Sequence, residues 1–428
     1  METLTNPRAP SDPPAARPRW VMLDPNVNNK VDSDPSVADA KQGRPPSLRK
    51  SFTVSFILAP PPATSSYHCD WIVGGAPGHG YDSNDDLRRR IVPDRDRSND
   101  LLVIAAHDDS VLIKMSVPER RGCFLRDYFL YETGGAARPP SLSLLPGCYI
   151  SKQFEREKGP TPSDRPRSLD NWNTGVLRRG GGELQVAQLE VMYGDPPHDT
   201  AELCVVRPGA EWDLKRLPIV HQEAGELPQW PELDAAVPVG VRFMCWVDYV
   251  NGFFLCDMAE PGGDLPRQVP LPEQHGRNSD RRPYLPYCRN LAAAGCDAVR
   301  FVSVAPRCCC GGHSETSCER SRFAFNVTTW TLTLRTEGPM TWVKDGVLDC
   351  DELWQLPNYS SLPRVTPRYP IVSSDNPDTV CFVVSETYAD KNVWLLEIDA
   401  RSKTLLSAVL HNTSGYFSHS RVPAKLRW

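Results

Sequence analysis

Five side chains that commonly bind metals crowd into one short, glycine-containing stretch of this 428-residue sequence. Thiolates and an imidazole are ligands that tetrahedral zinc prefers. Their spacing matches no standard zinc finger, and a further ligand would have to come from Cys350 or Cys288. We therefore favour a loop of reduced thiols over a zinc site, and we expect no cofactor. The five residues are Cys308, Cys309, Cys310, His313 and Cys318.

Asp248 and Asp257 form a second candidate site, because a predicted hairpin places them on one face as diagonal neighbours. Their separation would be about 7 to 8 Å, which suits the paired carboxylates of an inverting glycoside hydrolase. No third group is placed to orient a substrate. Aspartates also commonly accept backbone N–H groups at turns and strand ends. We favour this structural role and keep a glycoside-type hydrolase as an alternative function.

Carboxylates also cluster in the sequence DCDE at residues 349–352, which we interpret as turn and loop groups before Trp354. Calcium binding is the alternative, although the regular 12-residue calcium loop is missing. The sequence contains no G-x-S-x-G elbow, no H-E-x-x-H and no phosphate-binding P-loop. We therefore predict no catalytic residue and favour a protein that is not an enzyme.

The elements that would position these side chains are β-strands. Residues 243–258 read FMCWVDYVNGFFLCDM, and two apolar runs meet there at Asn251-Gly252, a dipeptide typical of a two-residue type I′ turn. Such a turn would pair Val250 with Phe253. One face of the hairpin would then be wholly apolar and the other half apolar, so the hairpin should lie between neighbouring sheets.

The same pattern recurs along the chain and gives roughly eighteen short strands in antiparallel pairs. The 42 prolines and 28 glycines disfavour long helices, and only Leu291–Ala294 is a candidate for one helical turn. So many strands need an arrangement that removes exposed edges. We predict an all-β, β-propeller-like fold with about five or six four-stranded blades, and two packed β-sandwiches are the alternative.

Composition and terminal sequence define the remaining organisation. Residues 1–19 are predicted to be a disordered Pro-rich tail, and residues 20–428 a single large all-β domain with a flexible charged loop at 74–100. The 48 Lys and Arg against 53 Asp and Glu give a net charge of -5, which disfavours nucleic-acid binding. No apolar stretch suggests a signal peptide or a membrane span, so we expect an intracellular protein, cytoplasmic or nuclear.

From residue 201 onwards the chain carries Trp-, Cys- and Asp-rich runs, such as VRFMCWVDYVNGFFLCDM, FAFNVTTWTLTL and WVKDGVLDCDELWQLP. In these runs it resembles the plant domain-of-unknown-function family 1618, which is expanded in grasses, and residues 201–410 are the most family-like region. The resemblance implies an intracellular β-rich protein with no assigned activity and no catalytic residues to carry over.

These observations predict a non-enzymatic binding or scaffold module whose loops engage an unknown protein partner, with no membrane association. A substrate receptor similar to F-box-associated propellers is an alternative. The sequence before Trp20 has no leucine-rich helical segment that could serve as an F-box, so such a receptor would act without one.

Overall fold

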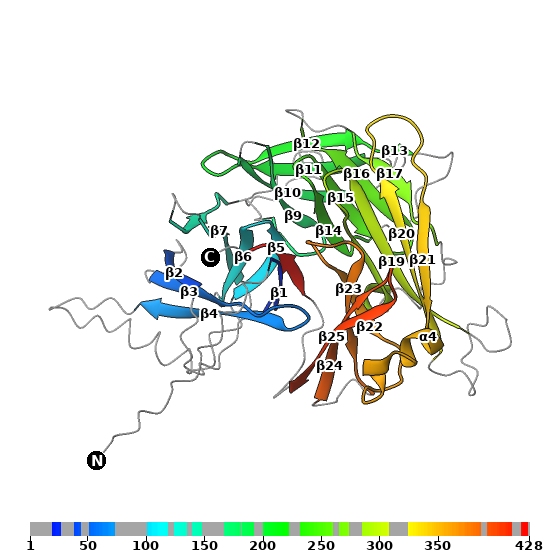
Figure 1. Ribbon diagram of the computed structural model, residues 1–428. Coiled ribbons are helices and arrows are strands. Elements are labelled where there is room, and N and C mark those ends of the chain that lie inside the picture. Colours follow the sequence, from blue (N-terminus) through cyan, green and yellow to red (C-terminus); the bar gives the residue numbers. More distant parts are fainter. Residues whose placement is uncertain are drawn as a thin grey trace, which may run out of the picture.

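Six small β-sheets stand in a ring in this computed structural model, with almost no helix (Figure 1). The arrangement is a six-bladed β-propeller, and it confirms the predicted fold class. The predicted tail up to residue 18 and the predicted loop at 74–100 lie outside the described residues. The structure describes residues 19–26, 38–43, 51–72, 101–118, 124–134, 139–147, 167–180, 182–191, 200–221, 232–259, 265–273, 285–307, 324–386, 392–412 and 421–426.

Each blade is one sheet, and we number the blades around the ring. Blade 1 contains, in spatial order, β2 (Ala38–Gly43), β3 (Ser51–Ile57), β4 (Thr64–Ile72), β1 (Val21–Leu23) and β26 (Val422–Ala424). Blade 2 contains β5 (Leu101–His107), β6 (Ser110–Pro118), β7 (Phe124–Glu132) and β8 (Ser141–Leu144). Blade 3 contains β9 (Thr174–Arg178), β10 (Leu184–Val191), β11 (Thr200–Val206) and β12 (Asp213–Pro218).

Blade 1 is given above from its outer strand inwards, and blades 2 and 3 from their inner strand outwards. The other three blades are given from the inner strand outwards. Blade 4 contains β14 (Ala235–Val239), β15 (Phe243–Asp248), β16 (Gly252–Asp257) and β17 (Arg267–Pro270), with β13 (Val220–His221) outside β17. Blade 5 contains β18 (Arg289–Ala293), β19 (Ala298–Pro306), β20 (Phe325–Thr333) and β21 (Val343–Asp349). Blade 6 contains β22 (Arg368–Val372), β23 (Thr379–Val384), β24 (Asn392–Asp399) and β25 (Thr404–Asn412). The described helical turns are α3 (Leu285–Cys288), α4 (Cys350–Trp354) and η4 (Pro357–Tyr359).

Blade 1 closes the ring, because it combines strands from distant parts of the chain. The early strand β1 pairs antiparallel with the late strand β26, Val21 opposite Ala424, and parallel with β4. On its other side β26 contacts β5, the innermost strand of blade 2. The ring therefore closes through hydrogen bonds between strands that lie far apart in the sequence.

The apolar core lies in the seams between blades, where strands bury side chains on both faces. In β15, Met244 and Trp246 join the cluster shared with blade 3, while Cys245 and Val247 join the cluster shared with blade 5. Five seams contain such a cluster among the described residues, and the seam between blades 6 and 1 contains a smaller one. This two-sided burial explains why the strands carry long apolar runs.

The predicted register of the blade 4 hairpin is wrong. Asp248 pairs with Gly252, so the loop contains Tyr249, Val250 and Asn251 instead of a two-residue turn at Asn251-Gly252. The Asp248 carboxylate accepts the Val250 N–H at 2.9 Å and the Asn251 side-chain amide at 2.8 Å. These two bonds stabilise the longer loop.

The predicted helical turn at Leu291–Ala294 is also wrong. Leu291 lies in β18 and pairs with Phe301 of β19. Its side chain is buried in the cluster between blades 4 and 5, where a strand places it more readily than an isolated helical turn does.

The two faces of the ring differ in how the chain crosses them. In blades 2 to 6 the antiparallel first and second strands meet in short turns on one face, at residues 108–109, 179–183, 240–242, 294–297 and 373–378. We call this the turn face. The strand ends that are joined by the connections from second to third strand, and from each blade to the next, lie on the opposite face, which we call the loop face.

Gly240 in the turn of blade 4 is expected to tolerate no side chain. Its φ is +55°, and an added Cβ would lie 2.1 Å from the carbonyl oxygen of Cys296 in blade 5. Gly240→Ala should lower the free energy of unfolding by about 2 kcal/mol, because it combines left-handed strain with a backbone clash. Urea denaturation measures the change. Gly180→Ala in the equivalent turn of blade 3, where nothing lies within 4 Å, should be neutral, and equal effects would contradict the packing argument.

Candidate functional site

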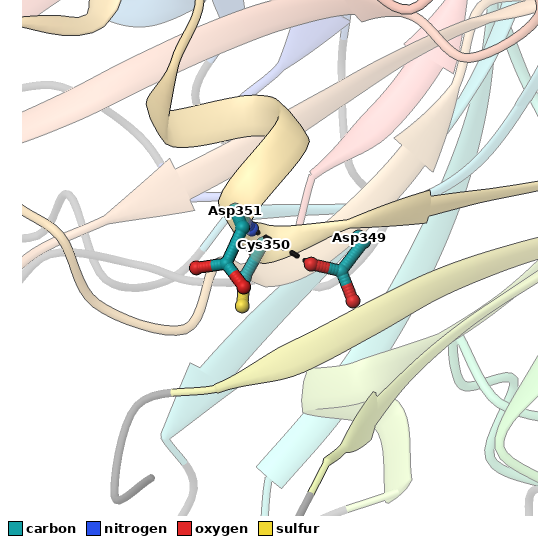
Figure 2. Close-up of side chains that lie close together, drawn as sticks. All are labelled: Asp349, Cys350 and Asp351. Carbon is teal, nitrogen blue, oxygen red and sulfur yellow. Dashed lines mark hydrogen bonds between the residues drawn. The ribbon is translucent and has the colours of Figure 1, made fainter. Parts of the chain in front are cut away.

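The group of potential metal ligands found among the described residues lies where β21 meets α4. Asp349, Cys350 and Asp351 each place one ligand atom within 4.8 Å of the others (Figure 2). The sequence predicted turn and loop carboxylates in this region, but Asp349 instead caps a helix. Its side chain accepts the Asp351 N–H at 2.9 Å, and the Glu352 carboxylate accepts the Asp349 N–H at 3.0 Å. This reciprocal pair is a capping box.

Basic side chains already compensate the carboxylates of this group. The two terminal nitrogens of Arg307 lie 2.6 Å from Asp349 and 2.7 Å from Asp351, while Lys403 lies 2.7 Å from Glu352. Burial raises the pKa of the Cys350 thiol, which disfavours the thiolate form that binds metals. The arrangement therefore supports helix capping and charge pairing better than it supports a bound calcium or zinc ion.

The cysteine-rich stretch that contains Cys308, Cys309, Cys310, His313 and Cys318 lies outside the described residues. Its described flanks, Arg307 and Ala324, are joined by an N–H to carbonyl hydrogen bond of 2.9 Å. Cys350 lies beside Arg307, with its sulfur 3.5 Å from Nη2. The zinc alternative for this stretch stays a prediction.

The structure contradicts the proposed pair of catalytic carboxylates. Asp248 pairs with Gly252 at the turn, whereas Asp257 pairs with Phe243 five residues along β16, so the two lie about 17 Å apart along the strand. The alternation of side chains also puts them on opposite faces of the sheet. No glycosidic bond can sit between them, and the hydrolase alternative based on this pair is wrong.

Both aspartates instead have structural partners. Asp248 is 1% exposed and holds the hairpin loop through the bonds described above. Asp257 accepts the Ala259 N–H at 2.9 Å and pairs with Arg242, whose Nη2 lies 2.5 Å from its carboxylate. The turn and strand-end role that the sequence favoured is confirmed for both residues.

A set of arginines that was not predicted from the sequence crosses the seams near the turn face. Arg300 of blade 5 lies 2.5 Å from Asp345 in its own blade and also pairs with Asp378 of blade 6. Arg178 of blade 3 reaches Asp109 of blade 2 at 2.6 Å. A charged residue within an otherwise apolar strand, as in AVRFVSV around Arg300, is the signal that could have revealed them, since a buried charge needs a partner.

Other arginines reach backbone carbonyls of a neighbouring blade. Arg179 of blade 3 donates to the carbonyl of Ala259 in blade 4, and Arg267 of blade 4 donates to the carbonyl of Gly338 in blade 5 at 2.6 Å. Both contacts are made to the connections between the third and fourth strands of the neighbouring blade. Several described arginines near the turn face thus link neighbouring blades.

His107 provides a pH-sensitive contact in the seam between blades 2 and 3. Its Nδ1 accepts the backbone N–H of Arg178 at 2.9 Å, a bond that requires an unprotonated Nδ1. Burial lowers the pKa of His107, and the charges of Lys425 and Arg178 act in the same direction, while Asp108 and Asp109 oppose them. The folded state therefore favours neutral His107.

Lowering the pH is expected to weaken this seam. The unfolded chain takes up the proton near the ordinary histidine pKa of about 6.5, while the folded state resists it, so stability falls as the pH drops through this range. His107→Gln should make the free energy of unfolding fall less steeply between about pH 7 and pH 5. Urea titrations at each pH measure how the free energy of unfolding of the wild type and of the variant depends on pH. An identical pH dependence would argue against a role for His107.

Comparison with known proteins supports the family resemblance. Residues 246–381, from blade 4 to blade 6, match the family described as "Protein of unknown function (DUF1618)". No curated protein matches the chain. No helix within the described ranges is long and apolar enough to cross a membrane.

Three solved structures illustrate the similarity. A putative 6-phosphogluconolactonase from Bacteroides uniformis shares 9% identity, with 71% of this chain and 83% of that chain covered and a TM-score of 0.27. The β-propeller domain of Cps50 (Swd1) from Myceliophteria thermophila shares 9% identity, with 70% and 82% covered and a TM-score of 0.26. The catalytic domain of a GH62 α-L-arabinofuranosidase from Coprinopsis cinerea shares 11% identity, with 92% and 97% covered and a TM-score of 0.28. At these scores none of them informs function, whereas the match over residues 246–381 confirms the resemblance of this chain to the DUF1618 family of proteins of unknown function.

Proposed function

We propose that this protein is a non-enzymatic binding module inside the cell, in the cytoplasm or nucleus, and that a protein partner docks on its loop face. The observation that carries the proposal is the unequal length of the connections on the two faces. The five longest connections between strands all join strand ends on the loop face, at residues 73–100, 145–173, 271–288, 307–324 and 350–367.

The turn face offers much less to a partner. Its longest connections span only residues 258–266 and 334–342, and several of its described charged groups pair with neighbouring blades. Long connections on a rigid ring can present many side chains in varied conformations, whereas tight turns expose few. The ring thus resembles a scaffold with one adaptable face.

Chemistry within the described residues agrees with a binding role. The two carboxylates that suggested hydrolysis are far apart, and the group around Cys350 is compensated by Arg307 and Lys403. Binding is therefore the function best supported by the geometry.

Proximity labelling in cells with the full chain tests the proposal. One variant replaces residues 75–98 by a short Gly-Ser linker, and a second carries Asn358→Arg on the exposed part of the 350–367 connection. The control is Glu337→Arg, an exposed position in the turn-face connection 334–342. We expect at least one loop-face variant to lose proteins that the wild type and the control both label.

Two results would count against this proposal. Equal labelling by all four proteins would mean that neither altered connection contributes to docking. Loss of the same proteins in the Glu337→Arg control would assign docking to the turn face. Co-purification of a ubiquitin-ligase adaptor would instead favour the substrate-receptor alternative.

A further inference from the structure

The outer edge of blade 6 differs from the outer edges of the other blades. Outer strands usually carry charges or are short, which prevents pairing with other chains. In this ring β12 reads DLKRLP and β21 reads VKDGVLD, while β8 and β13 are short. The strand β25 reads TLLSAVLHN, nine residues without Asp, Glu, Lys or Arg.

Apolar side chains are exposed along this edge. Leu406 is 54% exposed, Leu410 43% and Val409 37%, while Leu405 and Ala408 pack against the cluster between blades 5 and 6. The register with β24 shifts once, at the bulge near Leu406, and then runs regularly through Asn412. Among the described strands only β24 pairs with β25, so none of these strands occupies the opposite edge of this regular run, and an unoccupied edge can act as a template.

We infer that β25 is a self-association edge, and that its occupant is the β25 strand of a second copy of this chain, paired antiparallel. In a two-fold interface each residue at the axis meets its own copy, so charges there would repel one another. A register centred on Val409 places Val409 opposite Val409 of the second copy, Ala408 opposite Leu410, and Ser407 opposite His411. This run contains no Lys, Arg, Asp or Glu, which makes it compatible with itself.

The other outer strands are poorer candidates for the same contact. Antiparallel self-pairing of β12 or β21 would bring lysine and aspartate side chains into a narrow interface, where their desolvation is unfavourable. The strand β25 lies at the outer rim of the ring, so the inference is independent of the partner proposed for the loop face. It predicts a homodimer joined blade 6 to blade 6.

Sedimentation equilibrium of the full chain tests the inference. We expect the wild type to dimerise with a Kd in about the micromolar range, and Val409→Lys or Val409→Glu alone to weaken dimerisation at least about tenfold through like-charge repulsion at the axis. An equimolar mixture of the two variants should recover dimers, because lysine then faces glutamate. Val343→Lys is the control, since Val343 is 61% exposed on the outer strand β21 and should not affect association.

Each contrary outcome overturns the inference. A wild type that stays monomeric at about 100 μM has no functional edge contact. A dimer that persists in both charged variants uses another surface. A mixture that stays monomeric rejects the register centred on Val409, and circular dichroism of each variant confirms that the ring is folded.

Discussion

Trp246→Ala is expected to lower the free energy of unfolding by about 3 to 5 kcal/mol, the range for truncating a large buried aromatic side chain. Trp246 is fully buried in the seam between blades 3 and 4. Its indole N–H donates to the carbonyl of Asn173 in blade 3 at 2.8 Å, so the substitution also removes this hydrogen bond across the seam, while the Leu189 N–H still donates to the same carbonyl at 3.1 Å. The midpoint of urea denaturation reports the loss.

Trp172→Ala is the matched control for this prediction. Trp172 lies next to Asn173 but is 47% exposed, so its removal should change stability by less than about 1 kcal/mol. If both substitutions lowered the denaturation midpoint equally, the seam between blades 3 and 4 would not depend on the buried indole.

Arg300→Ala is expected to destabilise the protein by about 3 kcal/mol, because it removes the buried cation that compensates Asp345 and leaves Asp378 with only the exposed Arg401. The Arg300 side chain is 5% exposed, and it lies between Asp345 of its own blade and Asp378 of blade 6. The loss acts both within blade 5 and across the seam. Denaturant titration measures the change, and high salt should restore little of it because the site is largely screened from solvent.

Arg401→Ala is the control for Arg300→Ala, because it removes a positive charge from the same network at an exposed position. Arg401 also pairs with Asp378, at 2.9 Å, but its side chain is 72% exposed. An exposed pair contributes about 0 to 1 kcal/mol, and salt should remove even that contribution. An Arg401→Ala effect as large as that of Arg300→Ala would contradict the role assigned to the buried guanidinium.

The fold class was predictable because a local signal recurs along the chain. Short apolar runs separated by turn residues indicated antiparallel strands, and strands apolar on both faces indicated sheets stacked around a ring. The hairpin at 243–258 shows how far this signal reaches. Its two strands were predicted correctly, but both its faces are buried, so burial alone could not select between registers.

Several strands with weak apolar patterns were not predicted from the sequence. The strand β21 reads VKDGVLD because its outer edge faces solvent, and β4 reads TSSYHCDWI with mixed character. The strand β22 contains Pro370 and a register shift, features that argue against a strand when sequence alone is considered. These strands form because neighbouring strands in the blade supply hydrogen bonds, which a local pattern does not encode.

The candidate site was less predictable than the fold, since its contacts join distant residues. Arg307 directly follows β19 and Asp349 ends β21 in the same blade, and their ion pair follows from blade geometry. Asp248 and Asp257 were placed together only through the wrong register. A shift of three residues moved them to opposite faces, which shows how strongly a proposed active site in a β protein depends on strand pairing.

The pairing of β1 with β26 has a consequence for how this protein is made. The strand that completes blade 1 is synthesised after the strands of blades 2 to 6. These five blades can therefore form on the ribosome before the ring closes. Until β26 is in place, the apolar surfaces that it will contact, including Val21 and Leu23, remain partly exposed. Chaperone demand should therefore be greatest late in translation, and a message truncated before codon 422 should yield an aggregation-prone product.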